Sequence, residues 1–220
     1  MIWCLENQAL CNHAIKIPLR HPWSSDSDVD INIKVIQHEQ DVYRRLNLPG
    51  SVDGVQNNNK RVYRPVQIAW LRQMACVLEQ IHERRILVAD VATRKFLLDE
   101  NMCLKLCDFS GATVLPLETI CMEKVDDNGF SIQTDIGQLG AVMYEVITRQ
   151  KSEIDLFRDN APDDGRAAWP QRAELPNTDG LWLGWVMERC WTEGGFRNAG
   201  RLALALEFVG LDVPHYLNGV

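Results

Sequence analysis

The sequence lacks any long apolar run. No segment of its 220 residues approaches the roughly 18 consecutive apolar residues that identify a transmembrane helix. The first twenty residues include Glu6, Gln8 and His13, so they do not form the apolar core of a signal peptide. We therefore expect a cytoplasmic protein, with the nucleus as the alternative location, and no membrane partner.

Paired cysteines and a basic stripe are also absent. The seven cysteines never occur as C-x-x-C, the spacing typical of zinc and redox sites, so we expect reduced and mostly buried thiols. The formal net charge is -7, and Lys and Arg are scattered along the chain, which argues against a nucleic-acid partner. A chain of this length with 46% hydrophobic residues can form one full core.

Helical periodicity dominates the second half of the chain. After Pro65, four apolar residues recur at helical spacing: Leu71, Met74, Leu78 and Ile81. Four other segments have helical patterns: 35–46, 135–148, 182–191 and 202–209. The segment 135–148 is apolar on nearly every side, which is typical of a helix inside a domain.

Strand patterns are short and occur in pairs. "MIWCLE" and "CNHAIKIPL" predict one pair near the start of the chain, and "FLLDENMCLKLCDF" predicts a hairpin with a polar turn. Residues 20–30, 47–64 and 158–180 are polar or rich in Gly, Pro and Asn, so we expect loops there. The sequence thus predicts an α+β protein that is mainly helical.

Acidic residues occur at regular spacing in "ILVADVATRKFLLDENMCLKLCDFSG", residues 86–111. Asp90 ends a strand-like run, Lys95 follows five residues later, and the hairpin leads to Asp108, Phe109 and Ser110. This order and spacing resemble the protein kinase family. In that family one Asp orients the accepting hydroxyl and a second Asp holds a metal ion on the phosphates. The resemblance implies a catalytic role for Asp90, a metal-binding role for Asp108 and a structural role for Phe109.

Two downstream features extend the resemblance. Asp135 opens "DIGQLGAVMYEVIT" as an Asp opens the buried central helix of kinases, which implies that it holds the backbone of the loop at 88–90. "CWTEGGFR", at 190–197, is similar to the closing helices of the family. By the same resemblance, Glu123 and Arg197 form a structural ion pair.

Upstream, the resemblance is weaker. "HAIK" is similar to the Val-Ala-Ile-Lys strand of kinases, so Lys16 is the expected phosphate-binding lysine and Ala14 a wall of the adenine pocket. Glu39 is the expected ion-pair partner of Lys16. A surface lysine and a solvent-facing glutamate are the alternatives for these two positions. "DVATRK" looks more like the tyrosine-kinase form of this loop than the serine/threonine form.

Several family features are missing. Ala89 stands where kinases have Arg, so it cannot bind a phosphorylated loop. Lys95 stands where they have the metal-binding Asn, and a charged ammonium cannot be a metal ligand, although it could contact phosphate instead. No Gly-x-Gly-x-x-Gly precedes Lys16, and the segment between Leu46 and Val66 is too short for two strands, a hinge and a helix.

Three hypotheses remain open. The first is a pseudokinase, a non-catalytic module in which 1–64 is a reduced small lobe and 65–216 a helical large lobe that binds a protein partner. The second is a weakly active kinase that uses ATP and Mg²⁺ to phosphorylate a protein hydroxyl. The third is a truncated form of an active enzyme. Lys95 favours the first, because truncation alone leaves a metal ligand unchanged.

Overall fold

The computed structural model describes residues 3–5, 14–16, 24–46, 63–98, 103–118, 126–152, 154–157 and 166–211. For residues 3–5 and 14–16 only the backbone is described. Glu123 lies outside the described residues. So does the predicted loop at 47–64, except for Tyr63 and for Arg64, which already belongs to α2.

The described residues form an α+β protein that is mainly helical, as predicted. The helices are α1 (Asp26–Leu46), α2 (Arg64–Glu83), α3 (Ile132–Thr148), α4 (Gly184–Trp191) and α5 (Ala199–Leu211), with short 3₁₀ helices at Thr93–Lys95 and Arg172–Glu174. The strands are β1 (Trp3–Leu5), β2 (Ala14–Lys16), β3 (Ile86–Leu87), β4 (Phe96–Leu98), β5 (Leu104–Leu106) and β6 (Thr113–Val114). They pair antiparallel as β1 with β2, β3 with β6, and β4 with β5.

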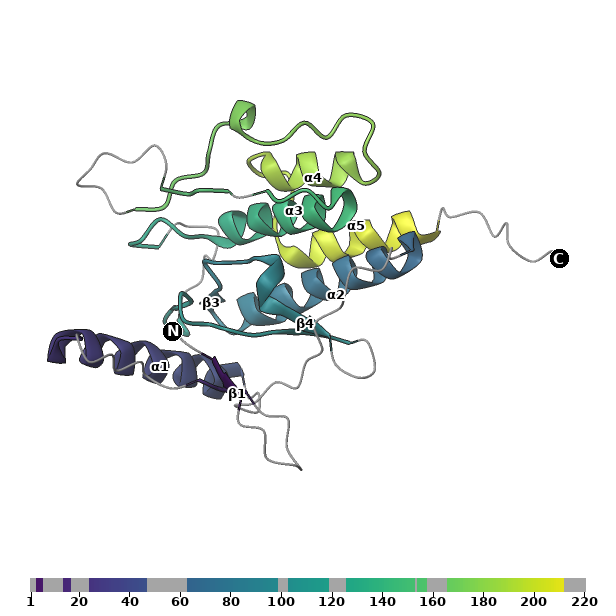
Figure 1. Cartoon of the computed structure of the whole chain (residues 1–220). Helices are drawn as coiled ribbons and strands as arrows, with labels where there is room; N and C mark the ends of the chain where they lie inside the picture. Colours follow the sequence, from purple (N-terminus) through teal and green to yellow (C-terminus); the bar gives the residue numbers. More distant parts are fainter. Residues whose placement is uncertain are drawn as a thin grey trace.

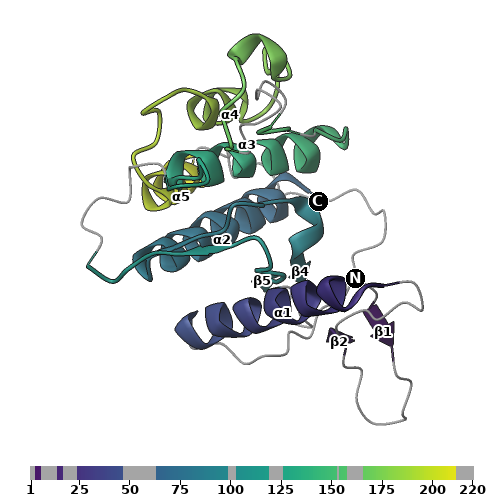
Figure 2. The ribbon, with the colours of Figure 1, turned by 90° about the vertical axis from the view of Figure 1, so that its left-hand side faces the viewer.

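The helices stack in layers. α2 packs against α5, α3 packs against α4, and α2 also contacts α3. Figure 1 shows α4 above α3, and α2 with α5 below them, while α1 lies apart at the opposite end of the molecule. In the perpendicular view of Figure 2, β4 and β5 lie between α2 and α1. The small hairpins thus join the helical body to α1.

The two central helices form for reasons visible in the sequence. All four periodic residues of α2, from Leu71 to Ile81, are buried, which confirms the predicted apolar face. α3 begins at Ile132, one turn earlier than predicted, because the Ser131 hydroxyl accepts a hydrogen bond from the Thr134 amide in a capping box. The helix ends at Thr148, and the next residue, Arg149, has a left-handed φ of 62°.

The expected loop at 20–30 is wrong in its second half, because α1 begins at Asp26. Ser25 and Asp28 form the reciprocal bonds of a helix start: the Asp28 amide donates to the Ser25 hydroxyl at 3.2 Å, and the Ser25 amide donates to Asp28 Oδ2 at 2.9 Å. Acidic side chains in the first turn also stabilise the helix, because they interact favourably with the positive end of its dipole. Serine and aspartate are common in loops but also cap helices, so this composition alone does not distinguish the two.

Two further expectations are corrected. Cys76, Cys103, Cys107 and Cys190 are free thiols, but Cys76 and Cys103 are exposed rather than buried. Burial raises the pKa of the Cys190 thiol. The sequence also favours core positions for the three tryptophans of the segment 182–191, but Trp185 is 50% exposed. Within the described ranges, no helix is both long and apolar enough to cross a membrane.

Candidate functional site

The loop at 88–91 is held by the first turns of α3. Asp135 is fully buried, and its two carboxylate oxygens accept the amides of Val88 and Ala89, each at 2.8 Å. His82 of α2 donates to the same carboxylate at 2.9 Å. Ala89 has a φ of 64°, a conformation that a non-glycine residue adopts only when its surroundings hold it there. Asp135 therefore fixes a strained backbone directly before Asp90.

Gln138 holds the same loop from the other side. Its Oε1 accepts the Val91 amide at 2.9 Å, and its Nε2 donates to the Ala89 carbonyl at 3.0 Å. The peptide groups on both sides of Asp90 are thus bound by one buried side chain. The sequence reasoning missed Gln138, although a polar residue within an otherwise apolar helix was a signal for it.

Asp90 is bound by two cations from its own loop. Arg94 Nη2 donates to both carboxylate oxygens of Asp90, at 2.8 and 2.7 Å. Lys95 Nζ lies 2.7 Å from Asp90 Oδ2. Lys95 is only 2% exposed, whereas the side chains of Asp90 and Arg94 reach solvent. The buried ammonium therefore gains its charge partner from Asp90.

Asp108 follows β5 and lies in the same region as Asp90. Its φ of 64° is again left-handed, and Ser110 Oγ donates to Asp108 Oδ1 at 2.8 Å. A Cβ built on Gly111 lies 3.9 Å from the Asp90 Cβ. The turn at 108–111 thus passes directly beside Asp90, which brings together the two predicted acidic segments.

Three residues of α1 contact this turn. Glu39 is buried, so the solvent-facing alternative is wrong, and its Oε1 accepts the Phe109 amide at 3.0 Å. His38 Nε2 donates to the Ala112 carbonyl at 2.6 Å. The Tyr43 ring meets the buried Phe109 ring edge to face, with centroids 5.2 Å apart, and burial raises the pKa of Tyr43.

The other predicted site residues are less fully placed. Ala14 and Lys16 lie in β2, where Lys16 pairs with Trp3 across the hairpin, and their side chains are not described. Arg197 is exposed between α4 and α5, and its predicted partner Glu123 is outside the described residues.

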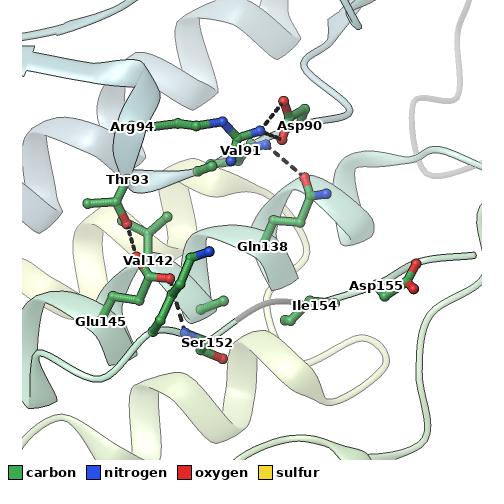
Figure 3. Close-up of a pocket in the computed structure, with 13 residues that line it drawn as sticks. Asp90, Val91, Thr93, Arg94, Gln138, Val142, Glu145, Ser152, Ile154 and Asp155 are labelled. Carbon is green, nitrogen blue, oxygen red and sulfur yellow. Dashed lines mark hydrogen bonds and ion pairs between the residues drawn. The ribbon is translucent and has the colours of Figure 1, made fainter. Parts of the chain in front are cut away.

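A cavity of about 570 Å³ opens beside the loop. Asp90, Thr93 and Arg94 line it from the loop, Glu145 from α3, and Asp155 from the segment that follows. Figure 3 shows Asp90 and Arg94 at one end, with Ile154 and Asp155 farther along the opposite wall. The Thr93 hydroxyl donates to Glu145, whose other oxygen accepts the Ser152 amide at 3.0 Å. The cavity thus has an ordered wall with charges of both signs.

The charges at Asp90 disfavour a divalent metal ion, because two cationic side chains already bind this carboxylate. Across the described ranges, no three His, Cys, Asp or Glu side chains gather into a group that could hold one. Asp90 is bound by two cationic side chains, and Ser110 binds one oxygen of Asp108. Mg²⁺ is usually bound by one or two carboxylates together with phosphate oxygens and water, and here a buried ammonium already contacts one of the two carboxylates.

An acid-bearing loop braced by a buried helix, followed by a short hairpin and a second acid, defines an α+β protein of the kinase-like class. Residues 48–197 match the family model described as protein tyrosine and serine/threonine kinase. Because this match covers more than half of the chain, the protein belongs to the protein kinase family.

Individual relatives are distant. The spermatocyte protein spe-8 of Caenorhabditis elegans is 27% identical over 47% of this chain and 22% of its own length. The tyrosine-protein kinase receptor TYRO3 of Danio rerio is 26% identical over 40% and 12%. The platelet-derived growth factor receptor beta of Takifugu rubripes is 23% identical over 82% and 19%. The chain therefore spans less than a quarter of the length of these relatives.

Proposed function

We propose that this chain is a non-catalytic kinase-family module that binds a protein partner. The observation that carries the proposal is the binding of Asp90 by Arg94 and Lys95. An ionised carboxylate has about four lone-pair positions, and three contacts already use the two oxygens of Asp90. To receive a substrate hydroxyl, Asp90 has to release cations that are attached to its own loop.

The hydrogen bonds that hold the loop at 88–91 support a binding role, because they keep this part of the site ordered. The side chains of Asp135 and Gln138 hold the loop through four hydrogen bonds, and His82 donates a further one to Asp135. The loop in turn forms one wall of the cavity. Because hydrogen bonds fix this loop and join it to Glu145 of α3, a partner segment meets a preorganised wall of the cavity.

The test of catalysis is a radiolabelled phosphotransfer assay with ATP and Mg²⁺, using protein and peptide acceptors. We expect no difference between the wild type and Asp90→Asn. A thermal melt should likewise show no rise in midpoint with ATP and Mg²⁺, since a ligand stabilises only a state that it binds. Wild-type transfer that disappears in Asp90→Asn establishes the alternative, a weakly active protein kinase.

The binding role is tested by photo-crosslinking in cells. A photoreactive amino acid replaces Ile154, which lines the cavity, and in a matched control it replaces Lys34, an exposed residue of α1. We expect a discrete crosslinked protein at position 154 that is absent at position 34. Equal patterns at the two positions contradict a partner at the cavity.

A further inference from the structure

The residue at position 95 is fixed in place by its backbone. Its amide donates to the Ala92 carbonyl at 2.9 Å, and its carbonyl accepts the Cys107 amide at 2.9 Å and the Cys107 thiol at 3.3 Å. Residue 95 is thus tied both to the Asp90 loop and to the strand end directly before Asp108. From this fixed backbone position, the side chain at 95 reaches the Asp90 carboxylate.

The side chain that stands there is a cation. Lys95 is 2% exposed, and its ammonium donates to Asp90 Oδ2 at 2.7 Å. An ammonium has three donors and no acceptor, so it cannot ligate a metal ion. A fixed positive charge in a poorly hydrated position also repels a second cation more strongly than it does in water.

The ammonium also supplies what a metal ion supplies in such a site, a positive charge against the Asp90 carboxylate. Asp90 accepts Lys95 directly, and Arg94 binds both of its oxygens from the solvent side. One carboxylate oxygen of Asp108 accepts a hydrogen bond from the Ser110 hydroxyl. The loop therefore has its counter-charge without any ion from solution.

We propose that Lys95 permanently replaces a divalent cation as the counter-charge of this site, so that the Asp90 and Asp108 segments take up neither Mg²⁺ nor Mn²⁺. The inference deepens the proposed function and rests on it for the identification of Asp90 and Asp108 as the acids of the site. It adds that the missing cation site is occupied by a side chain, and that a single substitution reopens it.

The test measures binding of Mn²⁺ alone, from the electron paramagnetic resonance signal of the free ion, to the full chain. Three proteins are compared: wild type, Lys95→Asn, and the control Lys34→Asn, which removes one positive charge from an exposed position. We expect Lys95→Asn to bind Mn²⁺ about tenfold or more tightly than the other two proteins, because an amide oxygen replaces a charge at the acids. Equal affinity in all three overturns the inference.

Asp108→Asn shows where any bound Mn²⁺ lies. If the wild type binds Mn²⁺ and Asp108→Asn abolishes that binding, the inference is overturned. If the Asp108→Asn variant still binds Mn²⁺ as the wild type does, the ion lies elsewhere on this acidic chain, and the inference is supported. This comparison decides the question even if Lys95→Asn fails to fold. Different results contradict the inference and the proposed function. Mn²⁺ binding at the two acids without Asp90-dependent phosphotransfer contradicts only the inference. Asp90-dependent phosphotransfer contradicts the proposed function.

Discussion

At the residue scale, Gln138 binds the two peptide groups that flank Asp90. Gln138→Leu keeps the approximate volume but leaves the Val91 amide and the Ala89 carbonyl unpaired in a buried site. We expect a loss of about 2–4 kcal/mol in the free energy of unfolding. Urea denaturation measures this loss. The control is Gln80→Leu on the exposed face of α2, whose free energy of unfolding should stay within about 0.5 kcal/mol of the wild type. Equal midpoints for the two variants exclude this role for Gln138.

Gly137 makes room for an aromatic ring from a distant loop. A Cβ at Gly137 meets Trp169 Cη2 at 2.0 Å, so Gly137→Ala forces the ring to move. We expect it to cost about 1–3 kcal/mol in the free energy of unfolding. In the Trp169→Ala background the same change should be neutral or stabilising by about 0.5–1 kcal/mol, since alanine favours the helix over glycine. A double-mutant cycle measures this, and a cost that stays the same in both backgrounds contradicts the contact.

At the element scale, α1 contacts the turn at 108–112 through His38, Glu39 and Tyr43. Glu39→Ala removes the acceptor of the buried Phe109 amide, an unpaired donor that costs about 1–3 kcal/mol. Hydrogen exchange should become faster in 26–46 while the amides of α2 to α5 keep their rates. Gln37→Ala, on the exposed side of α1, is the control and should change neither region. Faster exchange throughout the molecule shows instead that α1 unfolds with the helical body.

An ion pair between Arg172 and Glu188 joins the preceding loop to α4, and its contribution to stability depends on pH. Glu188 accepts Arg172 Nε at 2.8 Å, and this hydrogen bond holds the pKa of Glu188 below its usual value. A depressed folded-state pKa contributes stability above the unfolded pKa of about 4.3, and this contribution is lost as the pH falls through the folded value. We expect Glu188→Gln to lower the midpoint of thermal unfolding at pH 7 and to reduce its fall below pH 4. Glu83→Gln, at an exposed position, should follow the wild-type profile.

Local patterns predicted some elements well and others not at all. Periodicity identified α2 and α3 because each has a continuous buried face or core, and the polar turn identified the hairpin of β4 and β5. β6 has only two residues and exists because Thr113 and Val114 pair with β3, so no local signal marks it. Likewise, nothing near Gly137 in the sequence indicates Trp169. The spacing of the motifs predicted that Asp90, Asp108 and Asp135 lie in one region. It did not predict the contact of Lys95 with Asp90, which depends on the folded backbone at position 95.

At the scale of the whole molecule, the core belongs mainly to the helices after residue 63. The buried cluster runs through α2, α3, α4 and α5, and α1 adds only Val42 and Leu46 to its buried apolar members. The first half of α1 instead exposes Ile31, at 58%. The two-stranded sheet of β1 and β2 is also too small to be stable alone. The N-terminal part therefore depends on the helical body more than the body depends on it.

This asymmetry predicts the outcome of removing the N-terminal part. A chain of residues 63–220 loses the burial of Val42 and Leu46, about 3–6 kcal/mol by transfer energies, and leaves the Phe109 amide without Glu39. Because native domains have about 5–15 kcal/mol of stability, we expect this fragment to fold with a lower thermal midpoint but to keep one cooperative transition. Circular dichroism melts recorded in the far and near ultraviolet should coincide for the fragment, as they do for any two-state domain. A fragment that keeps helical signal but has no near-ultraviolet transition contradicts the boundary near residue 64, because it shows that α1 is needed to order the core.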